Sequence, residues 1–413
     1  MAEDKVTHMP LKHIKGHIFV KIDGEFWLID TGSPKSFGAG GSLTLGGKRF
    51  ALDTSHINLN TETLSQFVDV PCAGLLGMDI LGHFDIVFAV AEGKLSISTE
   101  SLQTYTNSNY FETIRLDEFM GIPVVNVVIR GIVYRMFFDS GAQISYFQCD
   151  SLTDFSPAGS FEDFYPGVGL FKTETYDVPM SFPRSTYLFR CGVLTETLGS
   201  VLISASAQGI IDNTILRNRT IGFYPRRHKI AIGNQVKGTG GYRYDKIDGF
   251  HNGFAVVHKK YGGYSAKLGC ISETGKEISP CKYDYFGSFH DGAAVVGVGG
   301  WDFWGDCSYM FVGRWGCVDK MGNEIVPVGK YKEVWSDRCR KFPWDAYFSE
   351  SMLAVCNWET GKWGFVDNNG NEVIQCKYDI VERFRYGKAK AVIDDGENRK
   401  WVYLDKTGKE TDM

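Results

Sequence analysis

The sequence predicts an all-β protein, and three observations carry that prediction. Aromatic residues make up 14% of the 413 residues, and the chain contains 48 glycines, a combination typical of short strands joined by tight turns. Several short runs alternate apolar and polar residues, and long helical periodicity is absent. Two different internal repeats divide the chain, one in its first part and one in its second.

The first repeat is a hairpin that ends in an acidic motif. Residues 19–29 turn at Asp23-Gly24 and lead into Asp30-Thr31-Gly32. Residues 124–138 turn at Arg130-Gly131 and lead into Asp139-Ser140-Gly141. A glycine-containing two-residue turn between alternating runs predicts a β-hairpin.

Each hairpin is followed by a second shared segment. Residues 74–81 and 209–216 align without a gap, and each continues into two further apolar runs. After two apolar residues the first copy has Gly77 and the second has Asp212. The same order of motifs in both copies indicates a duplication, so we predict two lobes, residues 12–104 and 105–233.

The second repeat begins after a glycine-rich linker, and its domain is predicted to span residues 241–413. In each unit a strand is followed by a glycine turn, a second strand and a Tyr-containing turn. One unit cannot bury its own aromatic face, so neighbouring units must stack and the Trp side chains are expected to anchor the core. The leading residues lie 47, 48 and 38 positions apart and begin the segments Leu268-Gly269-Cys270-Ile271, Trp315-Gly316-Cys317-Val318, Trp363-Gly364-Phe365-Val366 and Trp401-Val402-Tyr403-Leu404.

Charge and composition exclude several classes of function. The net charge of -5 leaves no basic face for nucleic acid or anionic lipid. No apolar run approaches the roughly 20 residues that span a bilayer, and the N-terminus has no apolar targeting region. We therefore expect a soluble, cytoplasmic protein.

Cysteines and histidines do not predict a metal site. The ten cysteines include no CxxC pair, and no His spacing completes a zinc pattern. We expect buried, reduced thiols, and neither a metal nor a cofactor. His8, His13 and His17 are expected to line a solvated edge.

The acidic motifs, with Leu75-Leu76-Gly77 and Ile210-Ile211-Asp212 downstream, resemble those of the aspartic peptidases. The compact lobes are most similar to the retropepsin-like branch, but here both halves lie in one chain. This resemblance covers about residues 14–233. The C-terminal array resembles the WG repeats common in bacterial proteins, which implies a β-rich domain with a binding role.

The peptidase resemblance implies that Asp30 and Asp139 form a catalytic dyad. One carboxylate would take a proton from a water molecule while the other donates a proton to the scissile carbonyl. Thr31 and Ser140 would brace the two loops, and Gly32 and Gly141 would let them close without a Cβ clash.

Two features of the dyad loops are unequal. Ser33 follows the first motif, whereas Ala142 follows the second. A hydroxyl beside Asp30 would favour its charged form, so we expect Asp30 to be the ionised partner. Asp212 replaces the glycine that the family has at this position. It is either solvated and harmless, or it crowds the second loop and raises the pKa of the dyad.

The cover over bound peptide is expected mainly from the second lobe. Gly167-Val168-Gly169 follows Tyr165-Pro166 and is predicted to form the tip of a flap hairpin. The glycines of the first lobe, Gly38 and Gly40, are a second candidate for this cover, but no Tyr lies between Asp30 and Leu75.

Two functions follow from these patterns. The first is a bacterial aspartic endopeptidase whose WG repeats dock a substrate or a protein partner. Having two lobes in one chain removes the need to dimerise, so a monomer is expected to suffice. The second is a catalytically silent peptide- or protein-binding module on the same fold. The distance between the two carboxyl groups discriminates the two hypotheses.

Overall fold

The computed structural model describes residues 6–102, 110–165, 169–217, 219–235, 243–260, 266–304, 308–334, 346–394 and 396–412. Of the described residues, 58% lie in strands and 9% in helices, so the all-β prediction is confirmed. The chain divides into two compact units, Met1–Arg243 (unit 1) and Tyr244–Met413 (unit 2). Among the described helices, none combines the length and the apolar character needed to cross a membrane.

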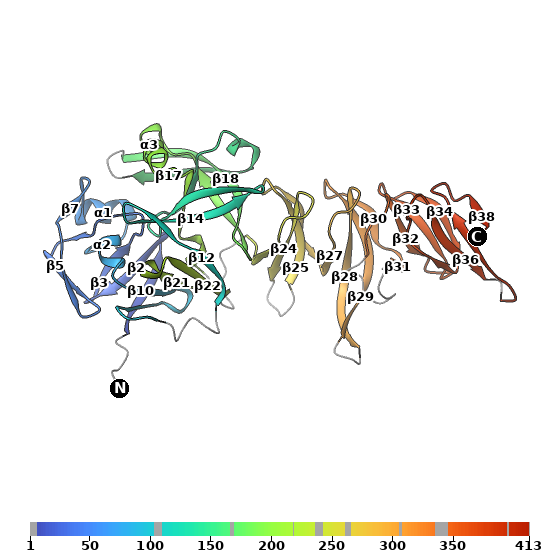
Figure 1. Ribbon diagram of the computed structural model, residues 1–413, viewed down its shortest axis with the longest axis horizontal. Helices are drawn as coiled ribbons and strands as arrows, with labels where there is room; N and C mark the ends of the chain where they lie inside the picture. Colours follow the sequence, from blue (N-terminus) through green and yellow to red (C-terminus); the bar gives the residue numbers. More distant parts are fainter. Residues whose placement is uncertain are drawn as a thin grey trace. The chain divides into compact units, whose positions relative to one another are not determined.

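The first half of unit 1 contains short strands and two helices (Figure 1). Its strands are β1 (Thr7–Ile14), β2 (His17–Ile22), β3 (Glu25–Ile29), β4 (Phe37–Gly38), β5 (Ser42–Leu45), β6 (Lys48–Ala51), β7 (Ser55–His56), β8 (Leu59–Asn60), β9 (Gly74–Leu76), β10 (Asp85–Ala89) and β11 (Lys94–Ser98). Its helices are α1 (Thr61–Val68), α2 (Met78–Leu81) and the 3-10 turn η1 (Val90–Glu92).

The second half of unit 1 repeats this order with longer strands. Its strands are β12 (Tyr110–Arg115), β13 (Asp117–Phe119), β14 (Ile122–Ile129), β15 (Ile132–Phe138), β16 (Ser145–Phe147), β17 (Ser156–Tyr165), β18 (Gly169–Ser181), β19 (Thr186–Gly192), β20 (Gly209–Ile211), β21 (Arg219–Tyr224) and β22 (Lys229–Gln235). Its helices are η3 (Leu152–Asp154), α3 (Glu196–Ser204), η4 (Asn213–Leu216) and η5 (Pro225–Arg227).

The two predicted hairpins form where the turn residues require them. Asp23 and Gly24 have φ values of 50° and 91°, and Arg130 and Gly131 have φ values of 49° and 78°. Positive φ at both central residues gives the turn whose twist matches that of the flanking strands. These turns join β2 to β3 and β14 to β15 in antiparallel register.

The segment after each hairpin enters its sheet in the same way in both halves. Strand β9 pairs parallel with β3, and β20 pairs parallel with β15. On their other edges, β9 and β20 pair antiparallel with β4 and β16. Each acidic motif therefore follows a strand that the downstream motif of the same half supports.

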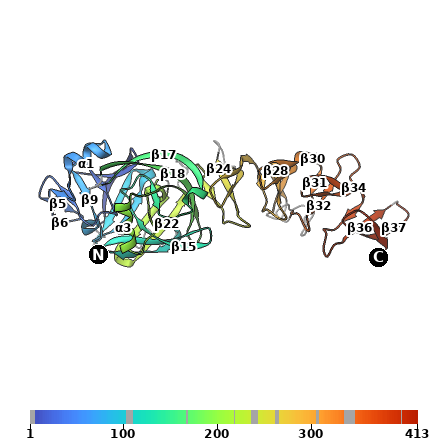
Figure 2. The same ribbon diagram turned by 90° about the horizontal axis from the view of Figure 1, so that it is seen from above.

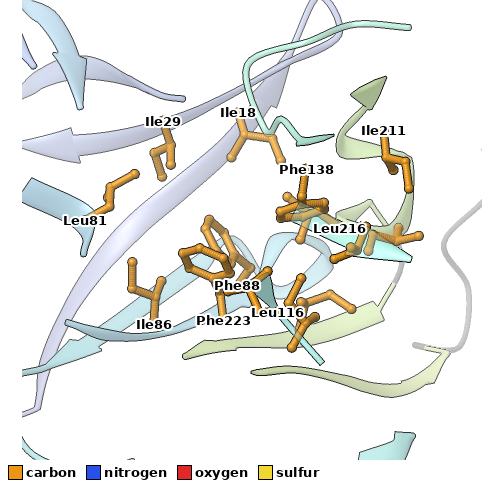
Figure 3. Close-up of a cluster of buried hydrophobic side chains, with 14 of the residues drawn as sticks. Ile18, Ile29, Leu81, Ile86, Phe88, Leu116, Phe138, Ile211, Leu216 and Phe223 are labelled. Carbon is orange, nitrogen blue, oxygen red and sulfur yellow. The ribbon is translucent and has the colours of Figure 1, made fainter. Parts of the chain in front are cut away.

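The two halves share one sheet and one hydrophobic core. Strand β10 pairs antiparallel with β21, with Val87 opposite Gly222. An ion pair reinforces this seam, because the buried Asp85 carboxylate contacts Arg226 at 3.0 Å and Arg227 at 2.6 Å. Side chains from both halves converge in the core, including Ile18, Ile29, Ile86, Phe88, Phe138, Ile211 and Phe223 (Figure 3).

Unit 2 is a row of repeat units, each of which has four antiparallel strands in the described residues. They are β23 (Lys246–Ile247), β24 (Phe254–Lys260), β25 (Ala266–Ser272) and β26 (Glu277–Tyr283); β27 (Tyr285–Phe286), β28 (Ala293–Trp304), β29 (Ser308–Asp319) and β30 (Glu324–Tyr331); β31 (Glu333–Val334), β32 (Met352–Cys356), β33 (Trp363–Asp367) and β34 (Glu372–Tyr378); and β35 (Ile380–Val381), β36 (Ala389–Asp394), β37 (Arg399–Leu404) and β38 (Glu410–Asp412). Trp315 and Trp363 are buried in the cores between units, which confirms their predicted anchoring role, whereas Trp401 near the C-terminus is 40% exposed.

Neighbouring units of the array are joined by a recurring side-chain contact. The hydroxyl group of Tyr283 donates to Glu324 at 2.9 Å, and that of Tyr378 donates to Glu410 at 2.9 Å. Tyr331 donates to Glu372 at 2.8 Å in the same way. Because a charged acceptor strengthens a hydrogen bond, this contact links each unit to the next.

In two of the repeat turns, a glycine, Gly322 or Gly370, lets neighbouring units approach closely. Gly370 has a φ of +83°, and a Cβ atom there would lie 1.9 Å from the carbonyl oxygen of Ile325 in the preceding unit. Gly361 has a φ of +67° and nothing within 4 Å of such an atom. The two positions therefore separate backbone strain from steric overlap between units.

We predict that Gly370→Ala destabilises the array more than Gly361→Ala. Both substitutions place a side chain at positive φ, which costs about 1–2 kcal/mol. Only Gly370→Ala adds overpacking, for about 1–3 kcal/mol more. The measurement is hydrogen exchange of the β33 and β34 amides in the full chain. Equal loss of protection in the two variants would contradict this account of unit stacking.

Candidate active site

The two aspartates occupy equivalent positions at the ends of β3 and β15. The backbone N–H of Asp30 donates to the Leu76 carbonyl at 3.0 Å, and that of Asp139 donates to the Ile211 carbonyl at 2.9 Å. The acceptors belong to β9 and β20, which pair parallel with the strands that carry the aspartates. The downstream motif thus fixes where each acidic loop begins.

Reciprocal hydrogen bonds between Thr31 and Ser140 hold the two loops together. The Thr31 N–H donates to Ser140 Oγ at 3.0 Å, and the Ser140 N–H donates to Thr31 Oγ1 at 2.9 Å. The same hydroxyl groups donate across the interface, from Thr31 to the Phe138 carbonyl at 2.7 Å and from Ser140 to the Ile29 carbonyl at 2.8 Å. Both side chains are fully buried, so these bonds are protected from competition with water.

Gly32 and Gly141 let each carboxyl group lie over the opposite loop. A Cβ atom on Gly32 would lie 2.4 Å from the carboxyl carbon of Asp139, and one on Gly141 would lie 2.7 Å from that of Asp30. Each glycine N–H also donates to the aspartate of its own loop, at 2.9 Å and 2.8 Å. Only glycine permits this approach, so the structure brings both motifs to one point.

The two carboxyl groups are hydrogen-bonded to each other and partly buried. Burial raises the pKa of Asp30 well above its ordinary value, and the negative charge of Asp139 raises it further. Burial also raises the pKa of Asp139, whereas its hydrogen bond with Asp30 lowers it. The two sites titrate as a pair, which holds one proton over a wide pH range.

The expected role of Ser33 in favouring a charged Asp30 is wrong. The Ser33 hydroxyl donates to the Lys35 carbonyl at 2.8 Å, so it does not reach the carboxylate. Its backbone N–H donates to Asp30 at 2.9 Å, and Ala142 donates to Asp139 in the same way at 3.2 Å. The two acidic loops therefore support their aspartates in the same way, through backbone N–H groups.

Gly77 and Asp212 occupy matching positions before α2 and η4. The Gly77 N–H donates to Ser36 Oγ at 2.8 Å, and the Asp212 N–H donates to Ser145 Oγ at 3.0 Å. A Cβ atom on Gly77 would lie 2.7 Å from the Lys35 carbonyl oxygen, which explains the glycine there. The Asp212 carboxylate caps η4 by accepting from the Thr214 N–H at 2.7 Å.

The Asp212 side chain is neither solvated nor in contact with the dyad by any hydrogen bond found in the described residues. It is 1% exposed, and burial raises its pKa to about 6. The charge of Arg217 and the bond from Thr214 offset part of this shift. Of the two alternatives for Asp212, the solvated one is therefore wrong, and its carboxyl group serves as a helix cap.

Asn213 supports the second acidic loop, and sequence reasoning missed it. Its side-chain amide donates to the carbonyl groups of Ser140 at 3.2 Å, Ala142 at 2.9 Å and Gly16 at 2.8 Å. Its own oxygen accepts from Arg217 at 3.0 Å. The corresponding residue in the first half is a methionine, so comparison of the two copies marks position 213 as different without revealing its contacts.

The β17–β18 hairpin of the second half lies close to both aspartates. Burial raises the pKa of Tyr165, and the negative charges of Asp139 and Asp30 raise it further. Both carboxyl groups are therefore within electrostatic range of this side chain. At the preceding residue, the Phe164 ring stacks on Phe67 of α1 with a centroid distance of 3.3 Å. Figure 2 shows β17 and β18 extending toward α1.

A second contact attaches the hairpin to strand β16 of its own half. The Tyr146 hydroxyl donates to the Asp163 carboxylate. Burial raises the pKa of both groups, and the charge of Asp163 raises that of Asp139. The hairpin is therefore attached to both halves, to Phe67 through Phe164 and to Tyr146 through Asp163.

The glycines predicted to cover the site have different fates. Gly169 begins β18 with a φ of +91°, whereas Gly167 and Val168 lie outside the described residues. Gly38 lies in the buried strand β4, where a Cβ atom would meet the Trp27 ring at 2.6 Å. Its assignment to a flap is wrong, because it belongs to the sheet. Gly40 is exposed in the turn that leads to β5.

The described residues contain no group of three or more His, Cys, Asp or Glu side chains that could hold a metal ion. The eight cysteines in these ranges are free thiols. His17 does not line a solvated edge as expected. It is partly buried, and its two ring nitrogens contact Gly141 and Gln143 at 2.9 Å and 2.7 Å.

Comparison with known proteins identifies similarity in unit 2. Residues 269–300, 315–338 and 363–396 match a family described as the WG containing repeat. The second and third segments begin at Trp315-Gly316 and Trp363-Gly364, and the first begins at Gly269 of the equivalent strand. The predicted WG-repeat array is therefore confirmed. No curated protein matches the chain.

We predict that the reciprocal hydrogen bonds between Thr31 and Ser140 stabilise unit 1. Thr31→Val removes the acceptor of the buried Ser140 N–H, and Ser140→Ala removes the acceptor of the Thr31 N–H. Each orphaned group costs about 1–3 kcal/mol, and the double variant should lose less than the sum of the two, because the sites are coupled. The measurement is urea unfolding of the full chain, followed by exchange of the β3 and β15 amides. Thr44→Val, at an exposed strand position, is the control, and strictly additive losses would contradict the coupling.

We predict that Asp212→Asn stabilises unit 1 above pH 6. The amide oxygen can still cap η4, while the substitution removes a carboxylate that burial makes unfavourable. Because the native pKa of about 6 exceeds the ordinary value of 3.8, the native state binds the extra proton between these values. The wild type therefore gains stability as pH falls through 6, so the advantage of the variant, at most about 3 kcal/mol, shrinks there. Urea unfolding at pH 5 and pH 8 measures this, with exposed Asp150→Asn as the control. A pH-independent difference would contradict it.

Proposed function

We propose that unit 1 is a single-chain, two-lobed, retropepsin-like aspartic endopeptidase with Asp30 and Asp139 as its catalytic residues. The observation that carries this proposal is the approach of two carboxyl groups, one from each half, each of which lies against the glycine of the opposite loop and has a raised pKa. Such a pair keeps one proton and one negative charge, the state required for general acid–base attack by water.

The chemistry follows from the paired protonation state. The ionised carboxylate takes a proton from water as its oxygen attacks the peptide carbonyl carbon, and the protonated carboxyl donates to the carbonyl oxygen. The resulting gem-diol collapses as its proton passes through the dyad to the leaving nitrogen and the C–N bond breaks. The glycine N–H donors hold each carboxyl group in place throughout.

The β17–β18 hairpin supports a peptide as the substrate. Tyr165 lies within electrostatic range of the dyad, and the Phe164–Phe67 stack and the Tyr146–Asp163 bond attach the hairpin to both halves. A hairpin offers backbone groups that pair with an extended peptide. We propose that it covers the bound segment, and that the WG repeats dock a substrate or protein partner.

The second candidate is a catalytically silent peptide-binding module. The contacts that attach the hairpin to both halves favour it, because they would restrict access to the dyad and slow the exchange of a bound peptide. Asp212 gives this candidate no support, since its carboxylate is occupied as a helix cap. Catalysis and binding alone differ in whether peptide bonds are broken.

We predict that Asp30→Asn abolishes cleavage of a proteome-derived peptide library while the chain still folds. An amide cannot share the proton of the pair, so kcat/KM should fall by at least about a thousandfold. Asp23→Asn is the matched control, because Asp23 is exposed at positive φ, where asparagine is equally tolerated. Mass spectrometry of the digests at several pH values identifies the cleaved bonds. Identical cleavages with both variants would refute the peptidase, and peptide retention without cleavage by the wild type would establish the binding module.

A further inference from the structure

Three side-chain hydrogen bonds attach the second acidic loop and η4 to the β1–β2 turn and the start of β2, and we call this set of bonds the grip. His17 Nδ1 lies 2.9 Å from the Gly141 carbonyl oxygen. Gln143 donates to the Lys15 carbonyl at 2.7 Å, and Asn213 donates to the Gly16 carbonyl at 2.8 Å. No equivalent set is found on the first acidic loop among the described residues. The grip is therefore specific to the loop that carries Asp139.

The partners of His17 determine its tautomer. A carbonyl oxygen can only accept, so Nδ1 must carry the proton that is donated to Gly141. The Gln143 amide nitrogen lies 2.7 Å from His17 Nε2, and its bond to the Lys15 carbonyl identifies it as a donor. Nε2 is therefore an acceptor, and both ring nitrogens are satisfied only when the imidazole is neutral.

We propose that His17 is a positioning residue for the Asp139 loop and that its protonation releases the loop, which lowers peptidase activity on the acid side. A second ring proton would point at the donating amide of Gln143 and break the contact. Gln143 lies against the turn, with its Cγ 3.1 Å from where a Gly16 Cβ would stand. Displacement of the Gln143 side chain from His17 therefore disturbs both the turn and the position of the Gly141 carbonyl group. This inference rests on the proposed function for its effect on catalysis.

The surroundings of His17 do not compensate an imidazolium charge. Burial lowers the pKa of His17, and the bond to Gly141 offsets this only in part. The titratable and charged groups on the adjoining elements include His8, Lys12 and His13 on β1, Lys15 in the turn, Asp139 in the loop and Arg217 after η4. Lys15 is ion-paired with Asp69 on the surface. Arg217 and His17 both lower the pKa of His13, so this corner disfavours added positive charge.

The direction of the pH effect follows from these shifts. A lowered native pKa means that the neutral ring is retained as the pH falls below 6.5, while the unfolded chain already binds the proton. The grip is therefore complete above pH 6.5 and is lost as the pH falls through the native pKa of His17. The dyad titrates on the acid side as well, so the histidine adds one proton to the acid limb of the activity profile.

NMR of the full chain tests the inference without any catalysis. The ¹⁵N shifts of the His17 ring should show the Nδ1–H tautomer at pH 7.5. The ring should titrate below the ordinary histidine range, and the Gly141 and Ala142 amide shifts should follow the same curve. Exposed His228 is the internal control. An Nε2–H tautomer, an ordinary pKa, or a loop that does not follow the titration would overturn the proposal.

Kinetics of His17→Gln and His17→Phe test the effect on the proposed reaction. Glutamine can donate to Gly141 but does not titrate, so its acid limb in log(kcat/KM) should be about one unit per pH unit shallower than that of the wild type. Phenylalanine loses the donor and should reduce kcat/KM at every pH, with rescue by glutamine at pH 7.5. His8→Gln should match the wild type. Parallel acid limbs in wild type and His17→Gln would refute the switch, whereas a wild type that cleaves nothing would refute the proposed function and leave the NMR result to decide the positioning role.

Discussion

The structure of unit 1 depends on holding two acidic groups together that electrostatics would drive apart. Each aspartate emerges from a strand of its own half, and each carboxyl group lies over the glycine of the other loop. The Thr31–Ser140 exchange fixes this approach with four buried hydrogen bonds. The β10–β21 pairing and the Asp85 ion pairs bind the same halves at a distance from the site. The interface between the two halves therefore determines where the two carboxyl groups lie.

The duplication is regular in its backbone and irregular in its side chains. Both halves use a serine hydroxyl to hold the residue before a short helix, through Ser36 and Ser145. Close backbone packing permits only glycine at position 77, whereas position 212 holds a carboxylate that caps the helix. Asn213 and His17 then attach the second loop to the first half. The symmetric backbone therefore brings the carboxyl groups together, and the side-chain differences between the two halves give the two loops different supporting contacts.

Sequence reasoning succeeded where a contact is local or repeated and failed where it is distant and single. The hairpins before Asp30 and Asp139 were predictable, because alternation and glycine turns are encoded within a few residues. The roles of Asn213 and His17 were not, since their partners lie far away in the chain and no local pattern selects them. Gly38 was misread for a related reason: a glycine needed for close packing on Trp27 has the same letter as one that tips a flap. Ser33 was misread because its hydroxyl had a nearer acceptor in Lys35.

The WG array shows the opposite relation between sequence and contact. The link from a tyrosine to a glutamate of the next unit occurs three times along it, and the glycine turn occurs four times in its sequence. A long-range contact that recurs at a fixed period becomes visible in one sequence, because every copy must keep the same residues in the same order. The dyad of unit 1 has only two copies of its motif, and Asn213 and His17, which support its second loop, occur once each. Periodicity therefore made the array recognisable without coordinates, whereas the surroundings of Asp30 and Asp139 had to be learned from their three-dimensional arrangement.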